Sequence, residues 1–226
     1  VVHAWSEKGG LGVFLKPSGY TGPEGGGGRE PGANGLAFDA KGRVWFTGQA
    51  GYYGRLVPAT NDIKVWKAPR GRGPYGIATT LGGDVYYASL AGNHIARIDT
   101  ETGEATVIEP PTRDQGARRV WSDSQGRLWV SEWSGAQLGR YDPASEAWQE
   151  WRLPGERPQP YAVYVDDQDF VWLSDFGANA MVRFDPTNET FQVNLANLAA
   201  GGRNVTIADS QGAGTITNDD ASAGPT

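Results

Sequence analysis

The sequence has no cysteine, one methionine and two histidines among its 226 residues. The absence of cysteine excludes disulfide bonds, thiolate metal sites and cysteine nucleophiles. No run of basic residues occurs and the formal net charge is −6, which argues against nucleic acid as a partner. No apolar run reaches the roughly 18 residues that a transmembrane helix needs, so we expect no membrane span.

What the sequence does contain is a repeated motif. An aromatic residue follows a branched one at Trp45, Tyr86, Trp129 and Trp172, at steps of 41, 43 and 43 residues. An arginine follows each aromatic residue about ten positions later. The four copies are GRVWFTGQAGYYGRLVP from Gly42, GDVYYASLAGNHIARIDT from Gly83, GRLWVSEWSGAQLGRYDP from Gly126 and DFVWLSDFGANAMVRFDP from Asp169.

A period of this length, with glycine and aromatic markers, is typical of β-propeller blades. The fold class we predict is therefore all-β, a propeller built of four-stranded antiparallel blades. Turns rich in Asp and Gly separate the predicted strands, as hairpins require. The repeats place four blades within 31–195, at about 31–71, 72–113, 114–156 and 157–195.

The regions outside the repeats are short. The chain begins Val1-Val2-His3 without an initiator methionine or a signal-like apolar segment, and we interpret it as a processed chain or a fragment. Residues 1–30 hold one predicted strand, Leu11 to Lys16, and a run of glycines that no Lys-Ser/Thr pair follows. We expect this segment to be a partial blade or a glycine-rich lead-in. Residues 196–226 are predicted to form two short strands, 205–209 and 213–217, and a flexible end.

Four blades predict a partial or open propeller with two exposed sheet edges. Exposed edges invite pairing with further strands or with other chains. We expect Leu11 to Lys16 and the two tail strands to add to these edges. Self-association through edge strands is the partner interaction that an open arc predicts.

Residues that recur in every blade indicate a role in the scaffold. We interpret the recurring arginines and the tryptophans Trp45, Trp129 and Trp172 as structural, with the tryptophans packed between blades. His94 has no equivalent and no carboxylate near it in the sequence. We expect it to be a surface residue. The recurring arginines are Arg55, Arg97, Arg140 and Arg183.

Hairpin pairing predicts one shared end of the blades. Gly48, Ser89, Glu132 and Asp175 end the second strands at the same end where Asn34, Tyr75, Arg118 and Tyr161 begin the inner strands. We expect an ion pair there between Glu132 and Arg118 or Arg119, lining a wet channel. The candidate channel-face residues are Asn34, Tyr75, Arg118, Arg119, Glu132, Tyr161 and Asp175.

These repeats resemble the streptogramin lyase family of virginiamycin B lyase-like proteins, across about residues 31–185. The motifs that carry the resemblance are Gly73-Pro74-Tyr75-Gly76-Ile77, Val44-Trp45-Phe46-Thr47, Ser131-Glu132-Trp133 and Gly139-Arg140. The resemblance implies a propeller of seven blades, and a Mg²⁺-assisted active site at the channel mouth. Its active members open a cyclic depsipeptide antibiotic by carbon–oxygen elimination across the ester, without water. The implied partner is a small cyclic peptide at the propeller face.

The sequence departs from this family where the chemistry lies. The family places catalytic histidines in Pro-His-Gly/Ala motifs that begin inner strands, one of them preceded by a metal-binding Glu. The four equivalent positions here carry no histidine, and Gly73 and Gln159 stand at the Glu position. Only Tyr75 matches a tyrosine that the family uses near its substrate. An elimination needs a base and a cation for the enolate, so we identify no catalytic residue or metal ligand and expect no lyase activity from this chain.

Two other functions remain open. A propeller can instead be a binding module, here presenting Tyr75, Arg118, Glu132, Tyr161 and Asp175 to a peptide, a glycan or another small ligand. Asn34-Gly35-Leu36-Ala37-Phe38-Asp39 also resembles a strand start of gluconolactonase-like hydrolases, in which an Asn joins Glu and Asp around a metal.

The end of the chain resembles the closing strands of a Calx-beta domain, in TFQVNLAN from Thr190 and VTIADSQGAGTITNDD from Val205. Such domains occur in extracellular and cell-surface proteins. The resemblance therefore implies a secreted, surface-attached or periplasmic bacterial protein, and we expect Asp219 and Asp220 to be solvated rather than metal ligands.

Overall fold

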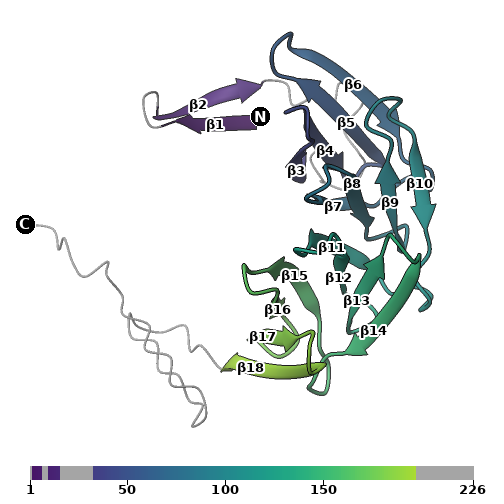
Figure 1. Cartoon of the computed structure of the whole chain (residues 1–226), viewed down its shortest axis with the longest axis vertical. Coiled ribbons are helices and arrows are strands. Elements are labelled where there is room, and N and C mark those ends of the chain that lie inside the picture. Colours follow the sequence, from purple (N-terminus) through teal and green to yellow (C-terminus); the bar gives the residue numbers. More distant parts are fainter. Residues whose placement is uncertain (1, 7–9, 16–32, 197–226) are drawn as a thin grey trace, which may run out of the picture.

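A computed structural model of the chain describes residues 2–6, 10–15 and 33–196. Every regular element in these ranges is a β-strand (Figure 1). Within the described ranges there is no helix of a length and apolar character that would cross a membrane.

Four antiparallel sheets of four strands each follow one another along the chain. The first blade contains β3 (Gly35–Phe38), β4 (Val44–Gly48), β5 (Tyr52–Val57) and β6 (Asp62–Lys67). The second contains β7 (Pro74–Thr79), β8 (Val85–Ser89), β9 (His94–Ile98) and β10 (Ala105–Ile108). The third contains β11 (Ala117–Ser122), β12 (Leu128–Glu132), β13 (Gln137–Asp142) and β14 (Ala147–Arg152). The fourth contains β15 (Pro160–Val165), β16 (Val171–Asp175), β17 (Ala180–Asp185) and β18 (Thr190–Ala196).

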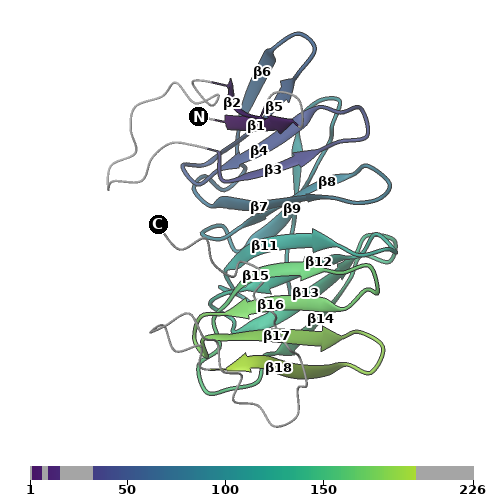
Figure 2. The same ribbon diagram turned by 90° about the vertical axis from the view of Figure 1, so that its left-hand side faces the viewer.

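The blades are arranged as an open arc. The inner strands β3, β7, β11 and β15 line its concave side, and the fourth strands β6, β10, β14 and β18 lie on its outside (Figures 1 and 2). Inner strands of neighbouring blades are in contact, β3 with β7, β7 with β11 and β11 with β15. Among the described strands, none joins the first blade to the fourth. The predicted all-β fold of four-stranded blades in a partial, open propeller is confirmed.

A separate hairpin precedes the blades. Its strands are β1 (Val2–Ser6) and β2 (Gly10–Leu15), which pair antiparallel in a sheet of their own. The strand predicted at Leu11 to Lys16 is therefore present as β2, but it pairs with β1 and extends none of the four blades. The predicted tail strands at 205–209 and 213–217 lie outside the described residues.

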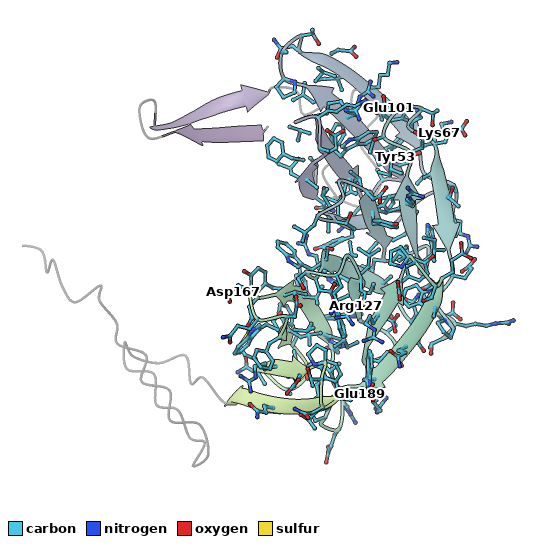
Figure 3. All side chains as sticks on the ribbon, in the orientation of Figure 1. Tyr53, Lys67, Glu101, Arg127, Asp167 and Glu189 are labelled. Atoms are coloured by element: carbon cyan, nitrogen blue, oxygen red, sulfur yellow. The ribbon has the colours of Figure 1, made fainter. Side chains whose placement is uncertain are left out.

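The core lies between the sheets, and side chains fill the spaces between neighbouring blades (Figure 3). Trp45, Tyr53 and Tyr87 belong to the cluster between the first two blades, while Trp129 packs in the cluster that reaches the fourth blade. Trp45 and Trp129 are fully buried, as predicted for packing between blades. Trp172, at the equivalent position of the last blade, is only partly buried, because no described sheet covers its outer side.

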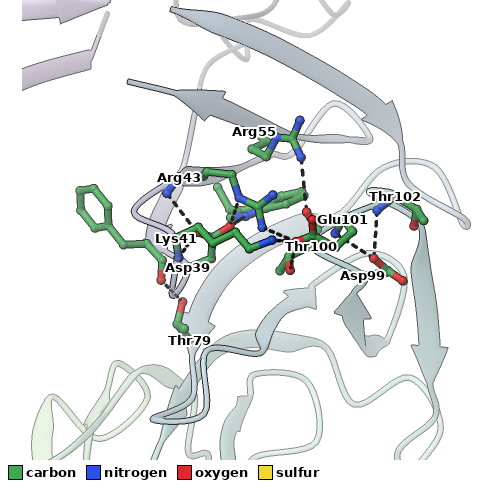
Figure 4. A network of polar contacts seen from close by, with 11 residues as sticks. Asp39, Lys41, Arg43, Arg55, Thr79, Asp99, Thr100, Glu101 and Thr102 are labelled. Atoms are coloured by element: carbon green, nitrogen blue, oxygen red, sulfur yellow. Dashed lines mark hydrogen bonds and ion pairs between the residues drawn. The ribbon is translucent and has the colours of Figure 1, made fainter. Parts of the chain in front are cut away.

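A turn aspartate holds each of these tryptophans. The indole Nε1 groups of Trp45, Trp129 and Trp172 donate to Asp39, Asp123 and Asp166 at 2.8, 2.9 and 2.7 Å. Asp39 also accepts a hydrogen bond from the Arg43 guanidinium, and the same guanidinium forms an ion pair with Glu101 of the next blade (Figure 4). Burial alone would raise the pKa of Asp39, but the hydrogen bonds from Trp45 and Arg43 lower it below its usual value.

The recurring arginines lie directly opposite the aromatic markers in the strand pairing. Arg55 and Arg140 cover Trp45 and Trp129, with the guanidinium carbon 5.8 and 5.5 Å from the ring centre. Where the tryptophan is replaced by Tyr86, Arg97 instead pairs with Asp84 at 2.7 Å. These contacts agree with the predicted structural role.

His94 is not a surface residue, so that prediction is wrong. Its side chain has no exposed surface, and its ring packs edge-on against Tyr87. Nδ1 lies 2.9 Å from the Gly92 carbonyl oxygen, and Nε2 has no partner. His94 is the first residue of β9 and pairs with Ser89 of β8. At this position the side chain of His94 is buried in the blade.

Candidate functional site

Bulges at the start of three inner strands shape one end of the arc. The strand pairing shifts register between Pro74 and Ile77 in β7, between Ala117 and Arg119 in β11, and between Pro160 and Val163 in β15. A bulge inserts an unpaired residue and changes the direction of nearby side chains. Tyr75, Arg118 and Tyr161 lie within these shifts, so three blades direct side chains to the same place.

Four aromatic rings meet there, and we call them the ring cluster: Tyr75, Trp133, Tyr161 and Phe176. Phe176 stacks on Tyr161 with ring centres 4.6 Å apart, and Trp133 meets both rings edge-on at about 6 Å. Tyr75 meets Tyr161 edge-on at 6.4 Å. Tyr75 is buried, whereas Phe176 is 59% exposed. The cluster therefore runs from the inside of the fold to its surface.

Two arginines lie against these rings, and we call them the arginine pair. The guanidinium carbon of Arg118 is 3.9 Å from the centre of the Tyr161 ring, 4.7 Å from Trp133 and 4.8 Å from Tyr75. The guanidinium carbon of Arg119 is 4.6 Å from the centre of Tyr75. Successive residues of a regular strand point to opposite faces, so the bulge explains why both arginines reach the same rings.

The tyrosine hydroxyls form the polar centre of the site. The Tyr75 and Tyr161 hydroxyl oxygens lie 2.7 Å apart, and Arg118 donates to the Tyr75 hydroxyl at 3.4 Å. The hydrogen bond with Tyr75 and the nearby Arg118 guanidinium lower the pKa of Tyr161 to about 8. Tyr161 is thus the group of this cluster that can change charge near neutral pH.

Hydroxyl side chains of the second strands hold the inner strands in place. Ser131 Oγ accepts from the backbone N–H of Arg119 at 3.1 Å and donates to the Tyr161 carbonyl at 2.9 Å. Thr47 does the same in the first blade, between Gly35 and the Tyr75 carbonyl. Each hydroxyl thereby links one blade to the next beside the ring cluster.

Glu132 and Asp175 end their strands beside this site but are fully buried. Glu132 accepts from Gln137 Nε2 at 2.6 Å and makes no ion pair with either arginine, so that prediction is wrong. Burial raises the pKa of Glu132 to about 8, and its second oxygen has no partner. Asp175 accepts the backbone N–H groups of Gln159 and Gly177 at 2.6 and 2.9 Å, which fixes the loop before β15.

The structure thus brings together Tyr75, Arg118, Arg119 and Tyr161 of the predicted channel-face residues. Asn34 is exposed directly before β3, where its N–H donates to the Thr47 carbonyl. Sequence reasoning missed Trp133 and Phe176 as site residues. Their position in the sequence could have indicated them, because they directly follow Glu132 and Asp175 at the ends of two second strands. The backbone N–H of each donates to a carbonyl in the loop before the inner strand of the same blade.

The described residues do not fit a Mg²⁺ site. They contain no group of three or more His, Asp or Glu side chains placed to hold a metal. Glu132 and Asp175 each have one oxygen without a partner, but they belong to different blades and are buried among other contacts.

A separate cavity of about 470 Å³ opens at the other end of the inner strands, lined by Phe38, Trp121 and several aspartates. Asp123 and Asp166 of its wall already accept hydrogen bonds from tryptophans, and Asp169 accepts from Ser124. The convergent polar groups and the tyrosine with an altered pKa lie instead at the ring cluster, which we take as the candidate site.

Comparisons with known proteins agree with the fold. A structure of virginiamycin B lyase from Staphylococcus aureus is 26% identical, with a TM-score of 0.65 over 70% of this chain and 53% of that chain. A catalytically inactive form of that enzyme with Quinupristin is 23% identical, with a TM-score of 0.67 over 74% and 56% of the two chains. A streptogramin B lyase is 24% identical, with a TM-score of 0.71 over 84% and 60%.

The chain spans between 53% and 60% of the length of these three structures. No curated protein matches it. The virginiamycin B lyase family matches residues 27–216, which is well over half of the sequence. The chain belongs to the virginiamycin B lyase family.

Proposed function

We propose that this chain is a ligand-binding propeller that holds a small peptide-like molecule against the ring cluster, and that its described residues do not open an ester. The observation that carries the proposal is the convergence of Tyr75, Trp133, Tyr161 and Phe176 from three blades on one partly exposed surface. Family membership supports a small cyclic peptide as the ligand, since one similar structure contains Quinupristin.

The ring cluster has the character of a recognition surface. Aromatic side chains bury a large apolar area and lose little conformational freedom, and tyrosine also offers a polar hydroxyl. Small-molecule sites combine such walls with a few polar groups that orient the ligand. Here the hydroxyls of Tyr75 and Tyr161 and the arginine pair provide those groups. A peptide with apolar side chains and backbone carbonyls would find partners for both.

The described residues place no exposed histidine or carboxylate at the ring cluster to act as the base of an elimination. The reaction needs a base with a pKa near the working pH and a cation beside the growing enolate. His94 is buried inside the second blade, and Glu132 and Asp175 are buried with other partners. Tyr161 is left as the one side chain of the ring cluster with a pKa shifted toward neutrality.

Lyase activity is the second candidate, and Tyr161 is the observation that favours it. A phenolate at this position could take the α-proton, while Arg118 would stabilise negative charge next to it. This candidate and the binding proposal agree on the place of the site and differ on whether the ester opens. An assay of ester opening, described at the end of the Discussion, separates them.

Calorimetric titration with quinupristin tests the binding proposal. Phe176→Ala removes an exposed ring that stacks on Tyr161 and should weaken binding by about tenfold, the value of an aromatic contact of about 1.4 kcal/mol. Phe38→Ala is the matched control, because Phe38 is 65% exposed at the other end of an inner strand. Equal weakening in both variants, or no binding by the parent, would contradict the proposal.

A further inference from the structure

The geometry points to a carboxylate site in the arginine pair, which would bind the acid group of an aromatic or peptide ligand lying on the ring cluster. This inference rests on the proposed function, because it assumes that a ligand occupies the cluster. It adds the chemical class of that ligand: an anion with an apolar body, in preference to its neutral ester.

The bulge in β11 concentrates positive charge. It brings the guanidinium carbons of Arg118 and Arg119 to within 4.8 and 4.6 Å of the centre of the same ring, that of Tyr75. Two cations held this close repel one another unless an anion or water offsets their charge. No carboxylate of the described residues forms an ion pair with either arginine.

The N–H groups of Arg118 have few close hydrogen-bond acceptors within the protein. Its Nε is buried and has no acceptor, and its contact with the Tyr75 hydroxyl is long, at 3.4 Å. Tyr161 and Trp133 lie against the guanidinium group at 3.9 and 4.7 Å from its carbon. A guanidinium held by rings keeps its N–H groups free at its edge, where a carboxylate or phosphate can accept two of them.

The nearest acidic residues do not serve as internal anions. Glu132 and Asp175 end the second strands beside the site, but their carboxyl groups bond Gln137 and the backbone of Gln159. Within the ring cluster, Tyr161 is the group that could neutralise the arginines by ionising. A bound carboxylate would therefore compete with the ionised form of Tyr161.

An ester and its acid differ in the group that the arginine pair recognises. A closed cyclic depsipeptide presents a neutral ester carbonyl, whereas the same molecule with its ester opened presents a carboxylate. Charge-assisted bidentate hydrogen bonds are roughly twice as strong as neutral ones. The site should consequently bind the opened acid more tightly than the closed ring.

The test compares quinupristin with the acid made by hydrolysing its ester, each titrated by calorimetry into the parent chain and three variants. In the parent we expect the acid to bind about tenfold more tightly, which corresponds to about 1.4 kcal/mol. Arg119→Gln and Arg118→Gln should each remove this preference, so that each variant binds the acid and the closed ring equally tightly, whatever affinity for both forms it loses. Arg152→Gln, which removes the same charge from an exposed position on the outermost strand β14, should keep the preference.

The outcomes separate the two proposals. Equal binding of acid and ester by the parent, or a preference that survives in both arginine variants, would overturn the carboxylate site and leave the proposed function standing. If neither form bound, the proposed function would fail and the inference with it. Thermal melting of each variant shows whether the fold is kept, and Arg119→Gln provides the test if Arg118→Gln does not fold.

Discussion

The hydroxyl oxygens of Tyr75 and Tyr161 lie 2.7 Å apart, although the residues are 86 positions apart in the sequence. They come from the second and fourth blades, and Arg118 of the third blade contacts both rings. A contact of this kind requires three blades to be correctly placed relative to one another. The ring cluster is therefore a property of the assembled arc and not of any single repeat.

Ionisation of Tyr161 is the first property to measure. Its pKa of about 8 depends on the Tyr75 hydroxyl and on Arg118. Tyrosinate absorbance should therefore show one tyrosine that ionises about two pH units below the usual value near 10. Tyr75→Phe should move this ionisation to higher pH, and Tyr161→Phe should remove it.

The control for that titration is Tyr164→Phe. Tyr164 is 51% exposed and lies on the same inner strand as Tyr161, so its loss should leave the early ionisation unchanged. A parent chain with no tyrosinate signal below about pH 9 would contradict the assigned role of Tyr75 and Arg118.

How far the sequence predicts this site depends on which physical feature sets each part. The period of the aromatic and arginine markers predicted the blades, because an aromatic residue and an arginine directly opposite it recur in each repeat. Hairpin order also predicted that Tyr75, Arg118 and Tyr161 begin their strands at one end. Their convergence depends on the register shifts at the starts of these strands, which the alternating strand pattern of the sequence does not show.

The same reason explains two errors. The ion pair predicted for Glu132 assumed that its side chain faces the channel, but in the strand pairing it lies opposite Gln137 and bonds that residue. His94 was expected at the surface because it is a lone histidine with no matching carboxylate in the sequence, yet it is the first residue of β9 and its ring is buried. In both cases a shift of one residue in the register of the strand decides whether the side chain faces the solvent or the core.

Glu132 should make the stability of the fold depend on pH. Burial raises its pKa in the folded state to about 8, above the ordinary glutamate value of 4.5. Between these values the folded state holds a proton that the unfolded state has lost, so stability falls as pH rises, by about 1.4 kcal/mol per pH unit. Urea unfolding at about pH 5 and pH 8 measures this fall.

Glu132→Gln cannot ionise and should not show that dependence. The variant is expected to gain stability relative to the parent as the pH is raised from about 5 to 8. Glu156→Gln is the control, because Glu156 is exposed. A parent and a Glu132→Gln variant with parallel pH profiles would show that the carboxyl group is ionised in the fold.

His94 should make the stability of the fold depend on pH in the opposite direction. Burial lowers its pKa from the value near 6.5, so the unfolded state binds a proton more readily than the folded state as the pH falls. Its contribution to stability is present above about pH 6.5 and is lost below it. Unfolding of His94→Asn, measured beside the parent between about pH 7 and 5, should show a smaller loss on acidification. A larger loss in the variant would be inconsistent with a buried neutral imidazole.

Gly76 allows the second and third blades to approach beside the site. A methyl group added at Gly76 would lie 2.7 Å from the Arg119 Cα and 3.0 Å from the Arg118 carbonyl oxygen. Gly76→Ala should therefore displace β11 from β7, lower the free energy of unfolding by about 1–3 kcal/mol, and weaken ligand binding. Gly82→Ala is the matched control, since its nearest neighbour would be Thr80 Oγ1 at 3.7 Å. Equal stability of the two variants would show that the blades are not in close contact at Gly76.

The most direct test of the central claim is an assay of ester opening, with quinupristin at a concentration that saturates the chain in neutral magnesium buffer. Reversed-phase chromatography separates the closed from the opened ligand, and mass distinguishes elimination, which leaves the mass unchanged, from hydrolysis, which adds one water. We predict that the bound ligand stays closed at the rate seen without protein, for the parent and for Tyr75→Phe, Tyr161→Phe, Glu132→Gln and Asp175→Asn alike. Opening above that rate, abolished by any one of these substitutions, would contradict the account and identify that residue as part of an active site.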